Sequence, residues 1–341
     1  MSVLSSQEKR ALVLGATGGI GGEVARQLRD TGWDVLALKR GLSMETEQRD
    51  GLTWLRGDAM ERQDVLDAAK GCAVIVHAVN PPGYRHWAEQ VVPMVDNTIA
   101  AAIAERATVV LPGTVYNYGP DAYRHIDEDA PQCPLTRKGR IRVQLEERLR
   151  DATRHGARTI VLRAGDFFGP RAGNSWFAQG LVQPGKPVRK VKQPGKPGVG
   201  HQWAYLPDVA QTMLALIERR DALEPFARFH MEGHWDADGS AMIEAIRRVA
   251  TRYGTDPKVS PFPWWLTKLA APFVPTLREM QEMRYLWQQP VHMDGSRLEV
   301  LLDGAPHTPL EVAVEATLRG LGCLPVSDGA RLRSSASQNL T

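Results

Sequence analysis

Short apolar runs alternate with amphipathic segments along the first half of the chain. The runs, such as residues 73–78, predict strands that are covered on both faces of a sheet. The amphipathic segments repeat apolar residues every three or four positions and predict helices. Regular alternation of the two predicts an α/β fold with a parallel, doubly wound sheet. The expected strands are residues 12–14, 34–38, 52–55, 73–78, 108–111 and 159–162, and the expected helices are residues 20–32, 61–70, 87–106 and 138–154.

The pattern changes after Gly169-Pro170, where residues 171–200 are rich in glycine, proline and cations. These cations predict either a solvated loop or a substrate-side loop that meets an anion. Further on we expect helices at 208–220 and 241–253, a strand at 226–231, and a helix that a capping box starts at Thr308-Pro309-Leu310-Glu311. We expect loops at 42–51 and 112–137, the latter an irregular active-site loop, and a disordered tail at 326–341. The aromatic segment 261–275 could form the core of a small lobe, an apolar substrate pocket or a dimer face.

Three glycines between the first strand and the first helix carry the clearest chemical signal. Gly15 allows a tight turn, Gly18 lets the backbone approach a pyrophosphate, and Gly21 lets the helix lie close to the strand. The open amides and the dipole of the helix start favour an anion. This spacing predicts a dinucleotide site, against the alternative of a tight turn without a ligand. The expected contacts here also include Thr17, Gly19 and Ile20.

The end of the second strand predicts which dinucleotide binds. An acidic residue there would accept from the ribose 2′-hydroxyl of NAD, but the chain has Lys39 and Arg40. A 2′-phosphate needs a cation, and a guanidinium can also stack on adenine, so we expect NADP, with NAD as the alternative cofactor. The opposing interpretation is that both cations are surface residues that end a strand. Asp58 and Ala59 are expected near the adenine, and His77, Ala78 and Val79 near the ribose and nicotinamide.

Bulk properties narrow the class of protein. The chain has 341 residues and a net charge of +3, which is too diffuse to predict a nucleic-acid or membrane partner. Its three cysteines form no C-x-x-C pair and are expected to be reduced thiols in a cytoplasmic protein. No signal-peptide core or transmembrane run is expected. His230 and His234 have metal-ligand spacing, but the segment lacks a third fixed ligand, so we expect no metal.

The chain resembles the extended short-chain dehydrogenase/reductases, the group that contains the NAD-dependent epimerase/dehydratases, over residues 10–320. The motifs that carry the resemblance are Gly15-x-x-Gly18-x-x-Gly21, Gly57-Asp58, Val76-His77-Ala78, Asp96-Asn97, Thr114 with Tyr118-Gly119, Leu162-Arg163-Ala164-Gly165, Phe168-Gly169-Pro170 and Tyr205-Leu206-Pro207-Asp208-Val209-Ala210. The resemblance implies a Rossmann-type sheet domain in residues 1–170, with a returning segment at about 201–232. It also implies a smaller substrate lobe, mainly in residues 171–325, and a cleft between the two. Asn97 is expected, as in the family, to bond backbone near the cofactor.

The family's catalytic set is only partly present. Thr114 matches the family's catalytic hydroxyl, but the Tyr-x-x-x-Lys pair that should follow is absent. The tyrosine slot holds Lys138 and the lysine slot holds Arg142. Lys138 could exchange a proton with the substrate only if its pKa were lowered, and Tyr116 is the preferred stand-in. The opposing interpretation is a solvated cationic helix face in which Arg142 pairs with Glu146.

These residues predict an NADP(H)-dependent oxidoreductase that acts on a carbonyl or alcohol group of a small organic or nucleotide-sugar substrate. Thr114 would polarise the substrate oxygen. A nucleotide-sugar epimerase or dehydratase is the first alternative, in which the cations of residues 186–196 would meet a pyrophosphate. A non-catalytic NADP(H)-binding sensor is the second, suggested by the missing tyrosine-lysine pair. A small-molecule substrate is expected, and a homodimer is left open.

Overall fold

A computed structural model describes residues 9–81, 87–123 and 125–325. Its largest element is an eight-stranded sheet with the strand order β11-β7-β6-β5-β1-β2-β4-β3. All neighbouring pairs are parallel except β3 and β4, so the predicted parallel, doubly wound fold is confirmed. The strands are β1 (Arg10–Leu14), β2 (Asp34–Lys39), β3 (Thr46–Arg49), β4 (Leu52–Arg56), β5 (Val74–His77), β6 (Thr108–Thr114), β7 (Arg158–Ala164) and β11 (Phe226–Met231).

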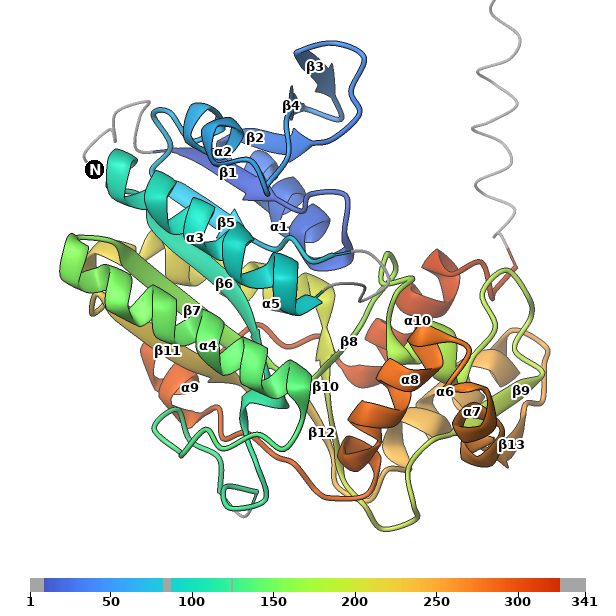
Figure 1. Ribbon diagram of the computed structural model, residues 1–341. Helices are drawn as coiled ribbons and strands as arrows, with labels where there is room; N and C mark the ends of the chain where they lie inside the picture. The colour runs from blue at the N-terminus through green and yellow to red at the C-terminus, as the bar shows by residue number, and fades with distance from the viewer. Residues whose placement is uncertain (1–8, 82–86, 124, 326–341) are drawn as a thin grey trace, which may run out of the picture.

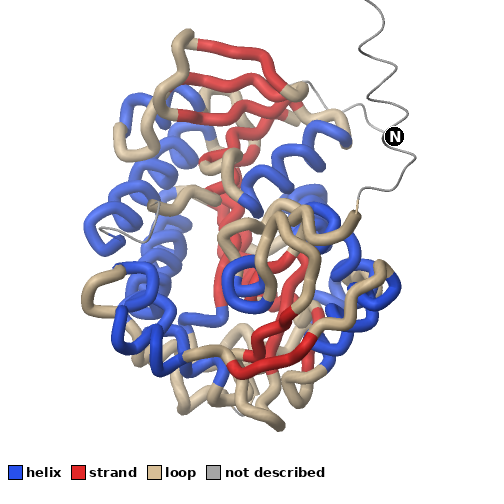
Figure 2. Tube along the Cα trace, turned by 90° about the vertical axis from the view of Figure 1, so that its right-hand side faces the viewer, coloured by secondary structure: helices blue, strands red, loops and turns tan. Residues whose placement is uncertain are grey.

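Helices cover both faces of this sheet (Figure 2). On β1, Ala11 and Val13 face the layer of α1 and α5, while Leu12 and Leu14 face the layer of α2, α3 and α4. Successive side chains of a strand point to opposite faces, so a strand buried on both sides reads as a continuous apolar run. The helices are α1 (Gly19–Asp30), α2 (Arg62–Ala68), α3 (Trp87–Glu105), α4 (Arg137–Ala152) and α5 (Leu206–Glu218).

The predicted loop over residues 42–51 is wrong, because β3 lies within it. β3 pairs with β4 at the sheet edge through a two-residue turn in which Asp50 and Gly51 both have positive φ, 55° and 71°. An Asp-Gly pair is a strong hairpin signal. The strand itself carries no apolar residue because its side chains are half-buried or exposed, so hydrophobic periodicity could not indicate it.

The second half of the chain builds a smaller unit beside the carboxyl ends of the strands, at the right of Figure 1. Its core packs Phe168, Phe177, Trp203 and Trp287 with aliphatic residues of α6 and α10. Its sheets are β12-β10-β8 and β13-β9. The elements of this unit are β8 (Asp166–Phe168), β9 (Lys190–Gln193), β10 (His201–Tyr205), β12 (His234–Asp236), β13 (Lys258–Pro261), α6 (Ala241–Arg252), α7 (Trp264–Ala270), α8 (Pro275–Glu282) and α10 (Leu310–Gly320). The helix α9 (Ser296–Leu302) packs instead against β11 of the large sheet.

Two expectations for this half need correction. No capping box starts α10: the hydroxyl of Thr308 donates to Asp208 at 2.7 Å, and Glu311 pairs with Arg248 instead of reaching back to the helix start. The aromatic segment 261–275 is core only in part, since Phe262 is buried while Trp265 and Phe273 are exposed. The strand at 226–231 and the helix at 241–253 are confirmed by β11 and α6.

The remaining expectations concern cysteines, membrane spans and the tail. Cys72, Cys133 and Cys323 form no disulfide. Within the described residues, none of the helices has the length and apolar character that crossing a bilayer requires. The tail expected at 326–341 lies outside the described residues.

Candidate active site

The turn between β1 and α1 is built so that only glycine fits at two of its positions. Gly15 has φ +91°, and a Cβ there would lie 2.5 Å from the carbonyl oxygen of Ala78. A Cβ on Gly21 would lie 2.4 Å from the carbonyl oxygen of Gly15. The amide of Gly18 donates to that same oxygen at 2.9 Å and closes the turn. No side chain of the N-cap residue Gly18 caps the first turn of α1, which leaves its amides open to an anion.

A cavity of about 680 Å³ connects this turn with the loop after β6. Eleven of the fourteen residues expected to bind the cofactor line it, namely Gly15, Thr17, Gly18, Gly19, Ile20, Lys39, Arg40, Asp58, Ala59, Ala78 and Val79. All four residues expected to act in catalysis also line it, namely Thr114, Tyr116, Lys138 and Arg142. The structure therefore brings the two predicted sets to one space, although they lie up to 127 positions apart (Gly15 to Arg142).

Gly21, His77 and Asn97 do not line the cavity. His77 is buried at the end of β5, where its Nδ1 lies 2.8 Å from the Thr98 hydroxyl. Burial and the nearby charge of Arg142 lower the pKa of His77 to about 3, so the ring is neutral. The Asn97 side chain donates to the carbonyl oxygens of Ala59 and Met60, each at 3.0 Å, and so holds the loop that forms one wall of the cavity.

Cations stand where β2 ends. Arg40 is largely exposed, and its Nη1 lies 3.7 Å from the carboxylate of Asp58. The ammonium of Lys39 lies 5.8 Å from the centre of the Trp54 ring. The Asp58 carboxylate also accepts from the amide of Met60 at 3.0 Å, which fixes the carboxylate in the cavity lining.

Thr114 is the last residue of β6, and Tyr116 lies in the short 3-10 helix η2 (Val115–Asn117) that follows it directly. The hydroxyl of Thr114 accepts from the amide of Tyr116 at 3.3 Å and so caps η2. The phenol of Tyr116 donates to the carboxylate of Asp166 at 3.4 Å. Sequence reasoning missed Asp166, which also lines the cavity.

The opposing interpretation, a solvated cationic face on α4, is wrong. Lys138 and Arg142 are only 5% and 7% exposed, and both lie over the ring of Trp87, with Lys138 Nζ at 6.0 Å and Arg142 Cζ at 5.2 Å from its centre. Glu146 pairs with Arg163 rather than with Arg142. Arg142 donates to the side-chain oxygen of Asn80 at 3.3 Å. The two cations are therefore part of the cavity wall.

The sequence model of the NAD dependent epimerase/dehydratase family matches residues 11–230, which is more than half of the chain. The chain belongs to this family. It is accordingly an NAD(P)-dependent enzyme, and the resemblance seen in its motifs is confirmed. The comparison with curated proteins finds no match.

Solved structures share the fold of this family member. UDP-glucose 4-epimerase from Thermotoga maritima, with UDP-glucose, has a TM-score of 0.69 at 16% identity and covers 91% of this chain and 98% of its own. The Bordetella bronchiseptica enzyme WbmH, with NAD+, has a TM-score of 0.66 at 15% identity, covering 92% and 98%. UDP-glucuronic acid 4-epimerase from Bacillus cereus, with UDP-glucuronic acid and NAD, has a TM-score of 0.68 at 16% identity, covering 92% and 98%.

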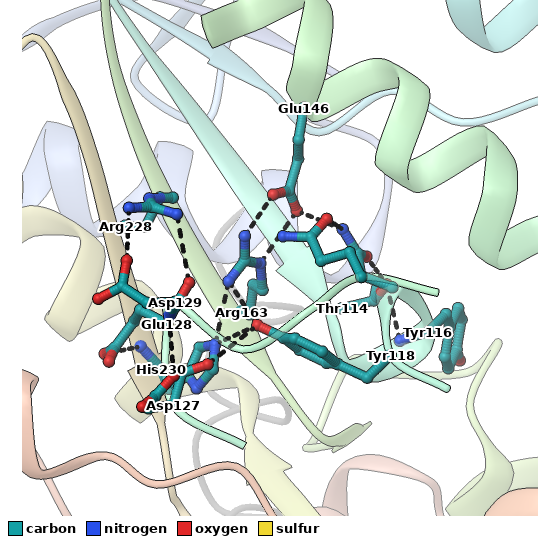
Figure 3. A network of polar contacts seen from close by, with 12 residues as sticks. Thr114, Tyr116, Tyr118, Asp127, Glu128, Asp129, Glu146, Arg163, Arg228 and His230 are labelled. Atoms are coloured by element: carbon teal, nitrogen blue, oxygen red, sulfur yellow. Dashed lines mark hydrogen bonds and ion pairs between the residues drawn. The ribbon is translucent and has the colours of Figure 1, made fainter. Parts of the chain in front are cut away.

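A buried polar network supports η2 in this epimerase/dehydratase family member (Figure 3). Arg163 on β7 donates to both carboxylate oxygens of Glu146, at 3.1 Å from Nε and 2.6 Å from Nη2, and to the phenol of Tyr118 at 2.6 Å. Asn117 of η2 donates to Glu146 at 2.9 Å. The network therefore fixes the segment that carries Thr114 to the sheet.

His230 completes the network from β11. Its Nδ1 lies 3.2 Å from the carbonyl oxygen of Ile126, so Nδ1 carries the proton and Nε2 accepts from the phenol of Tyr118 at 2.7 Å. Burial and the charge of Arg163 lower the pKa of His230 to about 3. His230 thus binds Ile126 and Tyr118 and holds the loop after β6 in place.

Proposed function

We propose that the chain is an NADP(H)-dependent oxidoreductase of the extended short-chain type, acting on a carbonyl or alcohol group of a small organic or nucleotide-sugar substrate. The observation that carries the proposal is the single cavity that joins the glycine turn to Thr114 and Tyr116. A dinucleotide fits this cavity because its phosphates can approach bare backbone at the start of α1, where a Cβ would fill the turn.

The choice of NADP(H) over NAD(H) is supported by charge. Lys39 and Arg40 line the cavity at the end of β2, where the ribose 2′ position of a bound dinucleotide is expected. Arg40 is exposed enough to turn its guanidinium toward a 2′-phosphate, exchanging its long contact with Asp58 for a charge-assisted hydrogen bond. NAD(H) is the alternative cofactor.

The chain's own side chains supply the polar chemistry. When bound, the nicotinamide ring exchanges a hydride with the substrate carbon. The Thr114 hydroxyl donates a hydrogen bond to the substrate oxygen, and Tyr116 or Lys138 exchanges the oxygen's proton. The buried cations Lys138 and Arg142 favour the oxyanion that develops in hydride transfer, because solvent screens the charges of buried side chains only weakly.

A nucleotide-sugar epimerase or dehydratase is the second candidate function, favoured by the fold shared with the sugar-nucleotide epimerases. The cations of residues 186–196 give it no support, since none of them lines the cavity, whereas Arg171 does.

A cytoplasmic location, supported by the unbridged cysteines, and a homodimer are proposals as well. The sensor alternative predicts that the chain binds NADP(H) but oxidises no NADPH with any substrate of the panel below.

Steady-state oxidation of NADPH over a panel of aldehydes, ketones and keto-sugar nucleotides tests the main proposal. We expect turnover of at least one carbonyl class and a fall in kcat of roughly 100-fold or more in Thr114→Ala. Product formed without a change in nicotinamide absorbance would instead identify an epimerase. Silence over the whole panel, or unchanged turnover in Thr114→Ala, would contradict the proposal.

A further inference from the structure

A polar chain runs from the cavity into the smaller unit, away from the residues that the family's motif would use. Tyr116 donates to Oδ1 of Asp166 at 3.4 Å, and Oδ2 of Asp166 lies 2.9 Å from Nε2 of His201. Nδ1 of His201 lies 3.1 Å from the carbonyl oxygen of Leu286. Tyr116 and Asp166 line the cavity, whereas His201 stands behind them.

The geometry decides where the protons of this chain lie. A carbonyl oxygen only accepts, so Nδ1 of His201 carries a proton that it donates to Leu286. Nε2 of His201 and Oδ2 of Asp166 lie at hydrogen-bond distance, so a second proton must lie between these two atoms. The pair is then either an imidazolium and a carboxylate or an imidazole and a carboxylic acid. Both arrangements leave Oδ1 of Asp166 as the acceptor for Tyr116.

Packing fixes this pair in place. Asp166 is 7% exposed and His201 is 5% exposed. The ring of His201 stacks on Trp287 at a centroid distance of 3.7 Å and an interplanar angle of 6°, and it also makes an edge-type contact with Trp203 at a centroid distance of 4.8 Å. Register places Asp166 opposite Trp203 on the paired strands β8 and β10, two positions from His201. The sheet backbone therefore sets the distance between the two side chains.

We propose that Asp166 and His201 are positioning residues that form a proton relay behind Tyr116, in place of the missing tyrosine-lysine pair. The inference rests on the proposed function. In the direction of alcohol oxidation, the substrate O–H bond breaks and its proton binds Oη of Tyr116. The phenol proton passes to Oδ1 of Asp166, and the Asp166–His201 pair releases one proton to water. The hydride leaves to the oxidised nicotinamide, and carbonyl reduction runs through the same steps in reverse.

The electrostatic reason for the histidine is specific. A lone carboxylate beside the phenol would oppose the negative charge that grows on Oη when Tyr116 gives up its proton. The pair instead has no net charge, because His201 shares a proton with Asp166. Tyr116 thus faces an acceptor for its proton without facing an uncompensated anion.

The kinetic test compares Tyr116→Phe, Asp166→Asn, His201→Gln and the double variant Tyr116→Phe with His201→Gln, measuring kcat, KM and NADPH binding by fluorescence. We expect each single variant to lose roughly 100-fold or more in kcat with KM for NADPH nearly unchanged. The double variant should lose no more than the worse single variant, because the residues act as one unit. Losses that multiply, or a His201→Gln variant with unchanged kcat, would overturn the relay. His292→Gln, a change at a half-exposed histidine outside the cavity, is the matched control.

A second measurement needs no substrate and so separates the relay from the proposed function. The ¹⁵N spectrum of the histidine rings in the full chain should show His201 protonated at Nδ1, with a hydrogen-bonded proton on the Nε2 side that Asp166→Asn removes. A His201 ring protonated only at Nε2 would overturn the relay even if turnover of a carbonyl substrate were found. If the spectrum is as expected but no substrate is turned over, the Asp166–His201 pair is supported and only the proposed function is contradicted.

Discussion

Replacing Glu146 by glutamine probes the polar network that supports η2. The side chain of Arg163 is 0% exposed and that of Glu146 is 4% exposed, and their closest N–O distance is 2.6 Å. Burial disfavours the charge of Arg163, but Glu146 outweighs this effect and the pKa of Arg163 is raised. Glu146→Gln keeps the shape and an acceptor for Asn117, but leaves the guanidinium buried without its counter-ion.

Removing one member of a buried ion pair costs about 3–5 kcal/mol, because the remaining charge stays desolvated. A typical domain is stable by only about 5–15 kcal/mol, so the loss is a large fraction of the total. Urea denaturation of wild type, Glu146→Gln and the exposed control Glu147→Gln at pH 7 measures it. Glu147 lies one position along the same helix and is exposed, so its change should stay within about 0.5 kcal/mol of wild type. An equally small effect in Glu146→Gln would refute the assignment of this pair as the support of η2.

Three further predictions follow from the same geometry. Gly15→Ala should abolish NADPH binding in a fluorescence titration, because its Cβ would meet the carbonyl oxygen of Ala78; full affinity in this variant would refute the turn as the phosphate site. Stability should fall as pH drops below about 6.5, since the folded-state pKa values of His77 and His230 are lowered to about 3 and the unfolded chain binds protons first. Each histidine should contribute a slope of about 1.4 kcal/mol per pH unit, and His77→Gln should have a shallower slope in urea melts from pH 7 to 4. Among the two candidate proton donors, Tyr116→Phe should reduce kcat far more than Lys138→Met, and the reverse order would assign the proton to Lys138.

The parts of the fold that depend on local sequence were predictable. The glycine spacing specified the β1–α1 turn because Gly15 and Gly21 face backbone atoms that leave no room for a Cβ. The Asp50-Gly51 pair is also typical of a hairpin turn. The strand before it is entirely polar, so no alternation of apolar residues indicated a strand there.

Long-range contacts explain what sequence could not predict. Thr308 and Glu311 have the residue types of a capping box, yet tertiary partners Asp208 and Arg248 take both side chains. Likewise, Glu146 lies four positions from Arg142 on one helix, but the buried Arg163 of β7 satisfies both of its oxygens.

The residues proposed to act in catalysis and to position Tyr116 show the same division. Thr114 was found from its motif, whereas Asp166 and His201 come from separate strands, β8 and β10, that only the folded sheet brings within 2.9 Å. No spacing along the chain indicates such a pair. A polar residue just after a buried strand, as Asp166 is after β7, was the one available signal.

The central claim is that the first βα turn and the cations at the end of β2 bind a phosphorylated dinucleotide. Calorimetric titration of wild type and Arg40→Ala with NADPH and with NADH tests it most directly. The predicted result is tighter binding of NADPH than NADH by roughly 10- to 100-fold, as expected for a charge-assisted hydrogen bond of about 1.5–3 kcal/mol, with this preference largely lost in Arg40→Ala. Absence of binding by both dinucleotides would contradict the claim.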